Sequence, residues 1–178
     1  IFPVISRSKC EAANMNEGAM QERIVLCRTL DEIQALLERF HMVLPSLKRG
    51  KAFRAAMAEK FFQHGKVVFI PEDGRAVGFA AFYCNDHVER KAYLSMIAVY
   101  PDMQGKGCGK ELLTYVEHTA KDCGMRTVWL EVSKANGSAR SFYRKNGYVP
   151  VEMRPESMIC AKKLENASDE WTEDTHDV

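Results

Sequence analysis

The chain has 178 residues, of which 46% are hydrophobic and 28% charged, a balance that predicts one globular domain with a proper core and excludes a fibrous protein. No apolar run reaches the roughly 20 residues of a membrane span, and the opening residues 1–5 are too quickly followed by Arg7 and Lys9 for a signal peptide, so we expect a cytoplasmic protein with no membrane partner.

The formal net charge of +1 is unevenly distributed. Residues 165–178 contain six acidic residues and no Lys or Arg, so the rest of the chain carries +7. We predict that 165–178 form an acidic disordered tail. The basic remainder suits a polyanionic ligand, but its basic residues form no dense run interleaved with aromatics, so we expect no nucleic-acid partner.

The six cysteines are scattered and form no C-x-x-C pair, which in a chain of this size indicates reduced thiols rather than disulfides. The five histidines are dispersed as well. We therefore expect no metal site.

Residues 1–22 show no periodicity, and we leave them outside the fold as an N-terminal arm or an expression remnant. Residues 23–28 are predicted to form a strand. A helix then begins at Thr29, and its apolar residues recur on one face: Ile33, Leu36, Leu37 and Phe40. Pro45 ends this helix, and a second helix follows and ends near Gly65, with apolar residues Phe53, Met57, Phe61 and Phe62.

The following segments favour strands at 66–71 and 76–84 around a turn at 72–74, and a buried strand at 92–99. An amphipathic helix is predicted at 109–121, ending at Gly124. A strand at 127–132, a helix at 138–145 that ends at Asn146 and Gly147, and strands at 148–153 and 158–164 complete the pattern.

The loop between the strand at 92–99 and its helix holds three alternating glycines, Gly105, Gly107 and Gly109. Glycine allows positive φ and close approach of a ligand, and a helix N-terminus offers unpaired N–H groups to an anion. The spacing does not fit a P-loop, because Glu111 follows Lys110, and it does not fit the dinucleotide fingerprint. A glycine-rich turn that merely caps a helix is the alternative.

The loop sequence also resembles a known family. Gln104, Gly107 and Gly109 occupy the positions of the Q/R-x-x-G-x-G/A acetyl-CoA signature of the GNAT superfamily of N-acetyltransferases. The similarity continues through the second block of that family, at residues 129–132, Asn136, Ala139, residues 142–143 and residues 147–148.

This resemblance implies an α/β (α+β) GNAT fold at residues 23–164. The expected architecture is a mixed, mostly antiparallel central sheet of six to seven strands flanked by about four helices, in the order β-α-α-β-β-β-α-β-α-β-β. The strands at 93–99 and 127–132 are expected to splay apart, and the pantetheine arm of the cofactor to lie in the gap.

The resemblance further implies acetyl-CoA as co-substrate, with no metal. The cofactor-binding residues that follow from the motif are Ile97, Ala98, Val99, Gln104, Gly105, Lys106, Gly107, Cys108, Gly109, Lys110, Asn136 and Tyr143. Backbone N–H groups of Ile97 or Val99 would polarise the thioester carbonyl. Asn136 is equally suited to be a helix N-cap. Cys108 as an acetyl-carrying nucleophile is a further alternative.

Two residues are the candidates for catalysis. By motif position Tyr143 is the general acid near the thioester sulfur, and the alternative is an aromatic residue packed on the sheet. Glu131 is the candidate base, since a glutamate and a tyrosine at this spacing are typical of relatives that acetylate ribosomal-protein N-termini. The alternative is that Glu131 is an ion-paired strand residue.

We therefore expect an N-acetyltransferase that moves an acetyl group directly to a primary amine of a small molecule, such as an amino sugar, through a ternary complex. A protein or peptide N-terminus is the alternative acceptor, and a non-catalytic coenzyme A sensor is the second alternative. We expect a monomer or a homodimer. Location in the fold makes six residues candidates for contacting the acceptor: Phe40, His41, Met42, Phe82, Tyr83 and Asp86.

Overall fold

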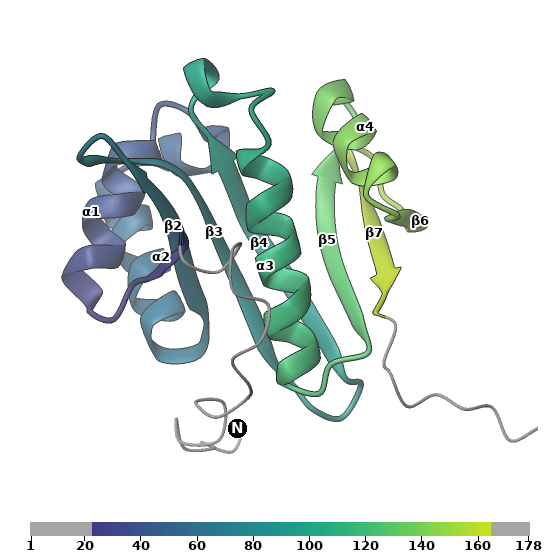
Figure 1. Cartoon of the computed structure of the whole chain (residues 1–178). Coiled ribbons are helices and arrows are strands. Elements are labelled where there is room, and N and C mark those ends of the chain that lie inside the picture. Colours follow the sequence, from purple (N-terminus) through teal and green to yellow (C-terminus); the bar gives the residue numbers. More distant parts are fainter. Residues whose placement is uncertain (1–22, 165–178) are drawn as a thin grey trace, which may run out of the picture.

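The computed structural model describes residues 23–164; the predicted arm at 1–22 and the predicted tail at 165–178 lie outside these residues. The described part forms a seven-stranded sheet in the order β1-β2-β3-β4-β5-β7-β6, with four α-helices packed on it (Figure 1). Only β4 and β5 pair in parallel, and the other neighbouring strands are antiparallel. The predicted fold class, strand number and element order are confirmed.

The strands are β1 (Val25–Leu26), β2 (Lys66–Glu72), β3 (Arg75–Asp86), β4 (Lys91–Val99), β5 (Thr127–Ser133), β6 (Val149–Met153) and β7 (Ser157–Lys163). The α-helices are α1 (Leu30–Phe40), α2 (Lys51–His64), α3 (Cys108–Asp122) and α4 (Gly137–Lys145). Two short 3₁₀ helices, η1 (Pro45–Arg49) and η2 (Pro101–Met103), follow α1 and β4.

The first helix begins where the sequence predicts it. Thr29 is the N-cap of α1, and the Thr29 hydroxyl accepts a hydrogen bond from the Glu32 N–H at 3.2 Å. The Glu32 carboxylate accepts in return from the N–H groups of Arg28 and Thr29. Because these two N–H groups serve the cap, the strand before them is shorter than the predicted 23–28.

The helices lie on opposite faces of the sheet. One core cluster joins α3 to the sheet through Leu112, Leu113 and Val116, and Tyr143 of α4 belongs to the same cluster. The other cluster joins α1 and α2 to the opposite face, with Leu37 from α1 as one of its fully buried members. We call the two sides the α3 face and the α1–α2 face.

A β-bulge interrupts β4. Ala81 of β3 pairs with Met96, but the next residue, Phe82, pairs with Leu94, so Ser95 is an extra residue in β4. The bulge reverses the side-chain alternation, since Leu94 lies in the core on the α3 face and Met96 in the core on the α1–α2 face. The strand patterning of the sequence does not reveal this bulge.

The predicted splay of β4 and β5 is confirmed. The two strands pair over four residues of each, and the last pair is Leu94 with Leu130. Beyond that pair the chain of β4 continues to Val99 next to β3, while β5 continues next to β7. Figure 1 shows the two strands diverging toward the ends at which the glycine loop and α4 begin.

Candidate functional site

The glycine loop lies at the open end of the gap between β4 and β5. Gly105 and Gly107 have φ of 79° and 90°, a region that only glycine adopts readily. Gly107 is the N-cap of α3, and a Cβ at Gly105 or Gly107 would meet no atom within 4 Å. The loop therefore leaves open space over the backbone at the N-terminus of α3, where an anion is favoured.

The third glycine has a different role. Gly109 lies inside α3, and its φ is not positive. A Cβ at Gly109 would stand in ordinary van der Waals contact, 3.5 Å from the ring of Phe142, so Gly109 lies where α3 packs against α4. Positive φ is thus found at two of the three alternating glycines.

Side chains from three parts of the chain fix the loop. Gln104 donates from Nε2 to the carbonyl of Val99 at 3.0 Å. The hydroxyl of Tyr100 donates to the carbonyl of Arg39 at 2.9 Å, which ties the loop to α1. Asp102 forms an ion pair with Arg75 at the start of β3. These three contacts fix the shape of the loop.

The backbone of β4 presents free groups to the gap. Tyr100 donates its N–H to Val77 of β3 at 2.9 Å, and hydrogen bonding to one neighbour alternates along an antiparallel strand. The N–H groups of Ile97 and Val99 therefore point away from β3, toward the gap that β5 has left, whereas the backbone of Ala98 faces β3. The bond from Gln104 to the Val99 carbonyl agrees with this orientation.

The remaining loop residues fall into two groups. Lys106 and Lys110 are exposed beside the loop, where a cation could meet a phosphate. Cys108 is only 2% exposed and packs into the core on the α3 face. Such burial gives no support to the alternative of Cys108 as an acetyl-carrying nucleophile, because a nucleophile needs access to its substrate.

Tyr143 lies on α4 and is 8% exposed. Its ring packs edge-on against Phe142 and Tyr148, with centroids 5.3 Å and 5.7 Å away. Burial, with a smaller contribution from Cys160, raises the pKa of Tyr143 well above its usual range. Tyr143 therefore keeps its proton at neutral pH and is available as a donor.

Asn136 is the N-cap of α4. Its Oδ1 accepts from the N–H of Ala139 at 3.0 Å and from the Ser138 hydroxyl at 3.1 Å. The alternative of a helix cap is confirmed, and a contact with a cofactor through the rest of the side chain stays a prediction.

Glu131 projects from β5 on the α1–α2 face, the side opposite Tyr143. Its Oε1 accepts a short hydrogen bond from the Ser157 hydroxyl, and its Oε2 is 3.3 Å from Nη1 of Arg154. Arg154 also binds Glu152, with 2.8 Å between Nε and Oε1. The ion pair that formed the alternative interpretation of Glu131 is therefore present, and the Glu131 side chain remains 39% exposed on the α1–α2 face.

The sequence analysis did not identify Tyr93 as part of the site. Tyr93 pairs with Trp129 across β4 and β5 on the face that carries Glu131. Burial and the charge of Glu131 raise the pKa of Tyr93, and Arg154 opposes them. The phenol, the carboxylate and the guanidinium therefore lie near one another, which only the strand register reveals.

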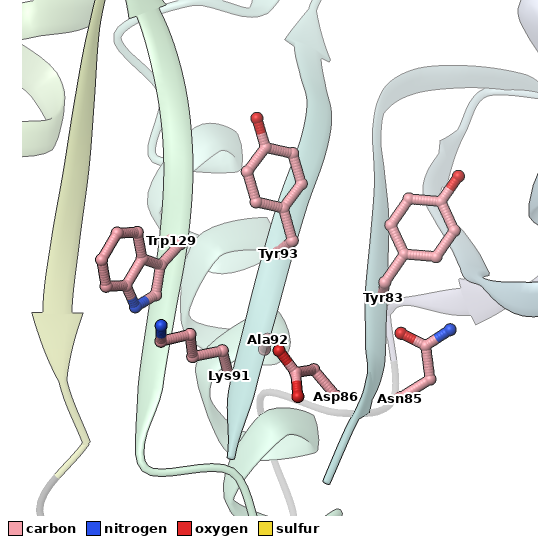
Figure 2. Close-up of a pocket in the computed structure, with 7 residues that line it drawn as sticks. All are labelled: Tyr83, Asn85, Asp86, Lys91, Ala92, Tyr93 and Trp129. Atoms are coloured by element: carbon pink, nitrogen blue, oxygen red, sulfur yellow. The ribbon is translucent and has the colours of Figure 1, made fainter. Parts of the chain in front are cut away.

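The residues that we expected to contact the acceptor differ in their exposure and position. Phe40 and Phe82 are fully buried, so the expectation that they contact an acceptor is wrong; for Phe40, the apolar spacing of the first helix already indicated a packed face. Tyr83 and Asp86 line a pocket on the α1–α2 face, together with Tyr93 and Trp129 (Figure 2). Met42 is 68% exposed beyond the end of α1.

Within residues 23–164 no group of three or more His, Cys, Asp or Glu side chains is placed to hold a metal ion. No disulfide bond joins any two of the five cysteines in that range. Every helix that the structure describes is too short or too polar to cross a membrane.

Comparison with known proteins gives one family. The model of the acetyltransferase (GNAT) family matches residues 30–148. The chain is 40% identical over 83 residues to a ribosomal-protein bS18-alanine N-acetyltransferase of Haemophilus influenzae, a match that covers 47% of this chain and 54% of the relative. It is 24% identical over 150 residues to an amino-acid acetyltransferase of Aeromonas salmonicida, covering 84% of this chain and 31% of that one. The matches thus span about half or less of these relatives.

The fold is also found in solved structures. A PaiA N-acetyltransferase of Thermoplasma acidophilum in complex with coenzyme A has a TM-score of 0.63 and 20% identity, over 79% of this chain and 98% of the other. At this identity the likeness concerns the fold.

Proposed function

This chain belongs to the acetyltransferase (GNAT) family, and we propose that it transfers an acetyl group from acetyl-CoA to a primary amine. The observation that carries the proposal is the gap between β4 and β5. Pairing of the two strands ends at Leu94 and Leu130, and from there the N–H groups of Ile97 and Val99 face the gap without a strand partner. Such a gap admits a thioester between two faces of one sheet.

The residues present fit acetyl-CoA. Its diphosphate would meet the N–H groups at Gly105 and Gly107, the open N-terminus of α3, and the cations Lys106 and Lys110. When bound, acetyl-CoA supplies an activated acetyl thioester. The N–H groups of Ile97 and Val99 would donate to the carbonyl oxygen as negative charge develops on it.

The two candidate catalytic side chains lie on opposite faces of the sheet, with the gap between them. Glu131 faces the side on which an amine can approach, and in the proposal it accepts a proton from the acceptor ammonium. Tyr143 lies on the α3 face; in the proposal it gives its proton to the departing sulfur and regains one from the attacking nitrogen, and its raised pKa keeps the phenol protonated until then. No residue becomes acetylated, so transfer takes place in a ternary complex.

We propose a small polar amine, such as an amino sugar, as the acceptor. The pocket beside Glu131 is compact and is lined by side chains from β3, β4 and β5 only, so it suits a small molecule. The amino-acid acetyltransferase among the relatives shows that small amines are acceptors elsewhere in this family.

A protein N-terminus is the second candidate acceptor. It is favoured by the 40% identity to the bS18-alanine N-acetyltransferase, whose name gives an alanine of a ribosomal protein as its substrate. The third possibility, a coenzyme A sensor, is disfavoured because Glu131 and Tyr143 both flank the gap.

Initial rates of coenzyme A release test the proposal. The purified chain is incubated with acetyl-CoA and, separately, with amino sugars, amino acids and peptides with a free N-terminus. We expect acceptor-dependent release with a small amine. Release with peptides alone would favour the second candidate. Acetyl-CoA binding in calorimetry without release by any acceptor would favour the sensor.

A further inference from the structure

The pocket of Figure 2 lies immediately below the point at which β4 and β5 separate. Its walls include Tyr93 and Trp129, which pair one position before the last bonded pair, Leu94 and Leu130. Glu131 follows two residues after Trp129 on the same face, a separation of roughly 7 Å along a strand. A ligand in the pocket would therefore reach Glu131 with one end.

The size and the rings of the pocket suit one six-membered ring. Its volume is about 160 Å³, and an engineered apolar cavity of about 150 Å³ binds benzene. Three aromatic side chains surround the space. Tyr83 stacks on Phe61 with 5.5 Å between centroids, and Trp129 is fixed by a 2.9 Å bond from Nε1 to the Thr127 hydroxyl. Such rings offer rigid apolar walls on which the C–H faces of a saturated ring can pack.

The polar groups of the pocket have unused hydrogen-bonding capacity. Asp86 accepts through Oδ1 from the N–H of Glu89 at 3.0 Å, which fixes the carboxylate, and Oδ2 has no partner among residues 23–164. Nζ of Lys91 is 3.1 Å from Glu89 and 4.6 Å from the Trp129 ring centre, which leaves further N–H donors. The carbonyl of the Asn85 amide is likewise unused within the described residues.

These groups discriminate between kinds of ring. An apolar ring would strip water from Asp86 and Lys91 without replacing their hydrogen bonds, which is costly. A ring with hydroxyl groups would replace them. Because Lys91 is already paired with Glu89, Asp86 leaves a net negative charge at this end of the pocket, which disfavours an acidic ring substituent.

We propose that this pocket binds the hydroxylated six-membered ring of an amino sugar and thereby presents the sugar's amine to Glu131. This inference rests on the proposed acetyl transfer and narrows its acceptor. Tyr93 orients the ring, since its hydroxyl points along β4 toward the gap, away from Asp86 and Lys91 (Figure 2). Asp86 determines specificity by binding ring hydroxyls.

Three kinds of amine test the ring requirement. The amino sugars are D-glucosamine and its 3-, 4- and 6-amino isomers. They are compared with the open-chain alditol of the best isomer, which keeps the hydroxyls and gains one from the ring oxygen, and with cyclohexylamine, a ring without hydroxyls. At saturating acetyl-CoA we expect kcat/KM for the best amino sugar to exceed both by at least about tenfold. Equal values for the sugar and its alditol would overturn the proposal.

The Asp86→Asn variant tests the assignment of Asp86. Asparagine keeps an oxygen that can accept from Glu89 and removes the charge, so the hairpin is preserved. We expect KM for the amino sugar to rise about tenfold, with kcat and the acetyl-CoA Kd unchanged. The matched control is Asp122→Asn, an exposed aspartate at the end of α3 on the opposite face, which should change neither constant.

The outcomes separate this inference from the proposed function. Turnover of peptides with no turnover of any amino sugar overturns the inference and leaves acetyl transfer standing. If no amine is acetylated although acetyl-CoA binds, the proposed acetyl transfer is wrong. Calorimetry with the methyl glycoside of glucosamine then still tests whether the pocket binds a sugar ring. Binding that Asp86→Asn weakens supports the pocket, and absence of binding overturns it.

Discussion

In the proposed reaction, Glu131 combines two roles that the sequence presents as alternatives. The contacts with Ser157 and Arg154 anchor the β6–β7 turn to β5, and the exposed part of the same carboxylate faces the acceptor side. An acceptor ammonium would therefore share Glu131 with the Arg154 guanidinium. The presence of the ion pair does not remove Glu131 as the candidate base.

A charge-neutral substitution separates these roles. Glu131→Gln keeps an oxygen that can accept from Ser157 and loses the ability to take a proton, so we expect kcat to fall by roughly 100-fold or more with little change in Tm. The matched control is Glu152→Gln, which removes the other partner of Arg154 and should leave kcat within a few-fold of the parent. Steady-state rates and thermal melts measure both. Equal, small losses in the two variants would make Glu131 structural.

Removal of one hydroxyl tests the general acid. We expect Tyr143→Phe to lower kcat at least about tenfold with little change in the acetyl-CoA Kd, because only the proton donor is lost and the ring contacts with Phe142 and Tyr148 remain. Rates and calorimetric titrations measure the two effects. Because burial raises the pKa of Tyr143, the parent rate should show no loss from its deprotonation near pH 10. Full activity of the phenylalanine variant would exclude the role.

At the scale of elements, the glycine loop permits a test with an internal control. Gly107→Val adds a branched side chain to the open space in front of the α3 N-terminus and strains a residue at φ 90°, so we expect acetyl-CoA binding to be lost. Gly124→Val places the same strain, at φ 76° and also in open space, at the other end of α3. If both variants lower Tm by a similar amount and only Gly107→Val loses acetyl-CoA binding, the loop assignment is supported. Unchanged affinity in Gly107→Val would refute it.

The contribution of the α1 capping box to the free energy of unfolding should be measurable. We expect Thr29→Ala to lower the free energy of unfolding by about 1 kcal/mol, because the Glu32 N–H loses its acceptor. Thr29→Ser keeps the hydroxyl and should cost much less. Urea denaturation measures both, and equal losses would show that the methyl group rather than the cap matters.

Some elements were predictable from local patterns and others were not. Local chemistry predicts helix α1 from the N-cap Thr29 and from the apolar spacing that ends at Phe40. It also predicts the start of α3 from Gly107. The structure confirms both helices. The bulge at Ser95 and the pocket around Tyr93 depend on how β3, β4 and β5 register with one another. No single segment contains that information, so sequence reasoning missed both.

At the scale of the whole molecule, a cysteine thiol and a tyrosine phenol with raised pKa values make the free energy of unfolding depend on pH. Burial, with a smaller contribution from Glu32, raises the pKa of Cys27 from 9.0 to about 12, and burial raises the pKa of Tyr83 from 10.0 to about 12. Above pH 9 the unfolded chain loses the thiol proton that the folded chain retains. Stability is therefore complete below about pH 9 and falls as pH rises toward about 12, by at most about 1.4 kcal/mol per pH unit for each group.

Urea midpoints between about pH 8 and about pH 11 measure this dependence. Cys27→Ala removes the titrating thiol, so its stability should fall less steeply with pH than that of the parent, whatever the variant loses in packing at every pH. Parallel curves for parent and variant would contradict the assignment of the alkaline loss to Cys27.

In the proposed reaction, the two substrates lie on opposite faces of one sheet. Helix α3 and its loop offer an anion site on one face, the pocket and Glu131 lie on the other, and the separation of β4 and β5 connects them. Direct transfer of the acetyl group through this gap is the central claim.

Mass spectrometry of the acceptor tests that claim most directly. The chain is incubated with isotopically labelled acetyl-CoA and the panel of amino sugars and peptides, beside the Tyr143→Phe variant. A gain of one labelled acetyl group on an amine, much reduced in the variant and without an acetylated form of the protein itself, is the predicted result. An acetylated protein that passes its label to the amine, or no labelled acceptor although acetyl-CoA is bound, would contradict direct transfer.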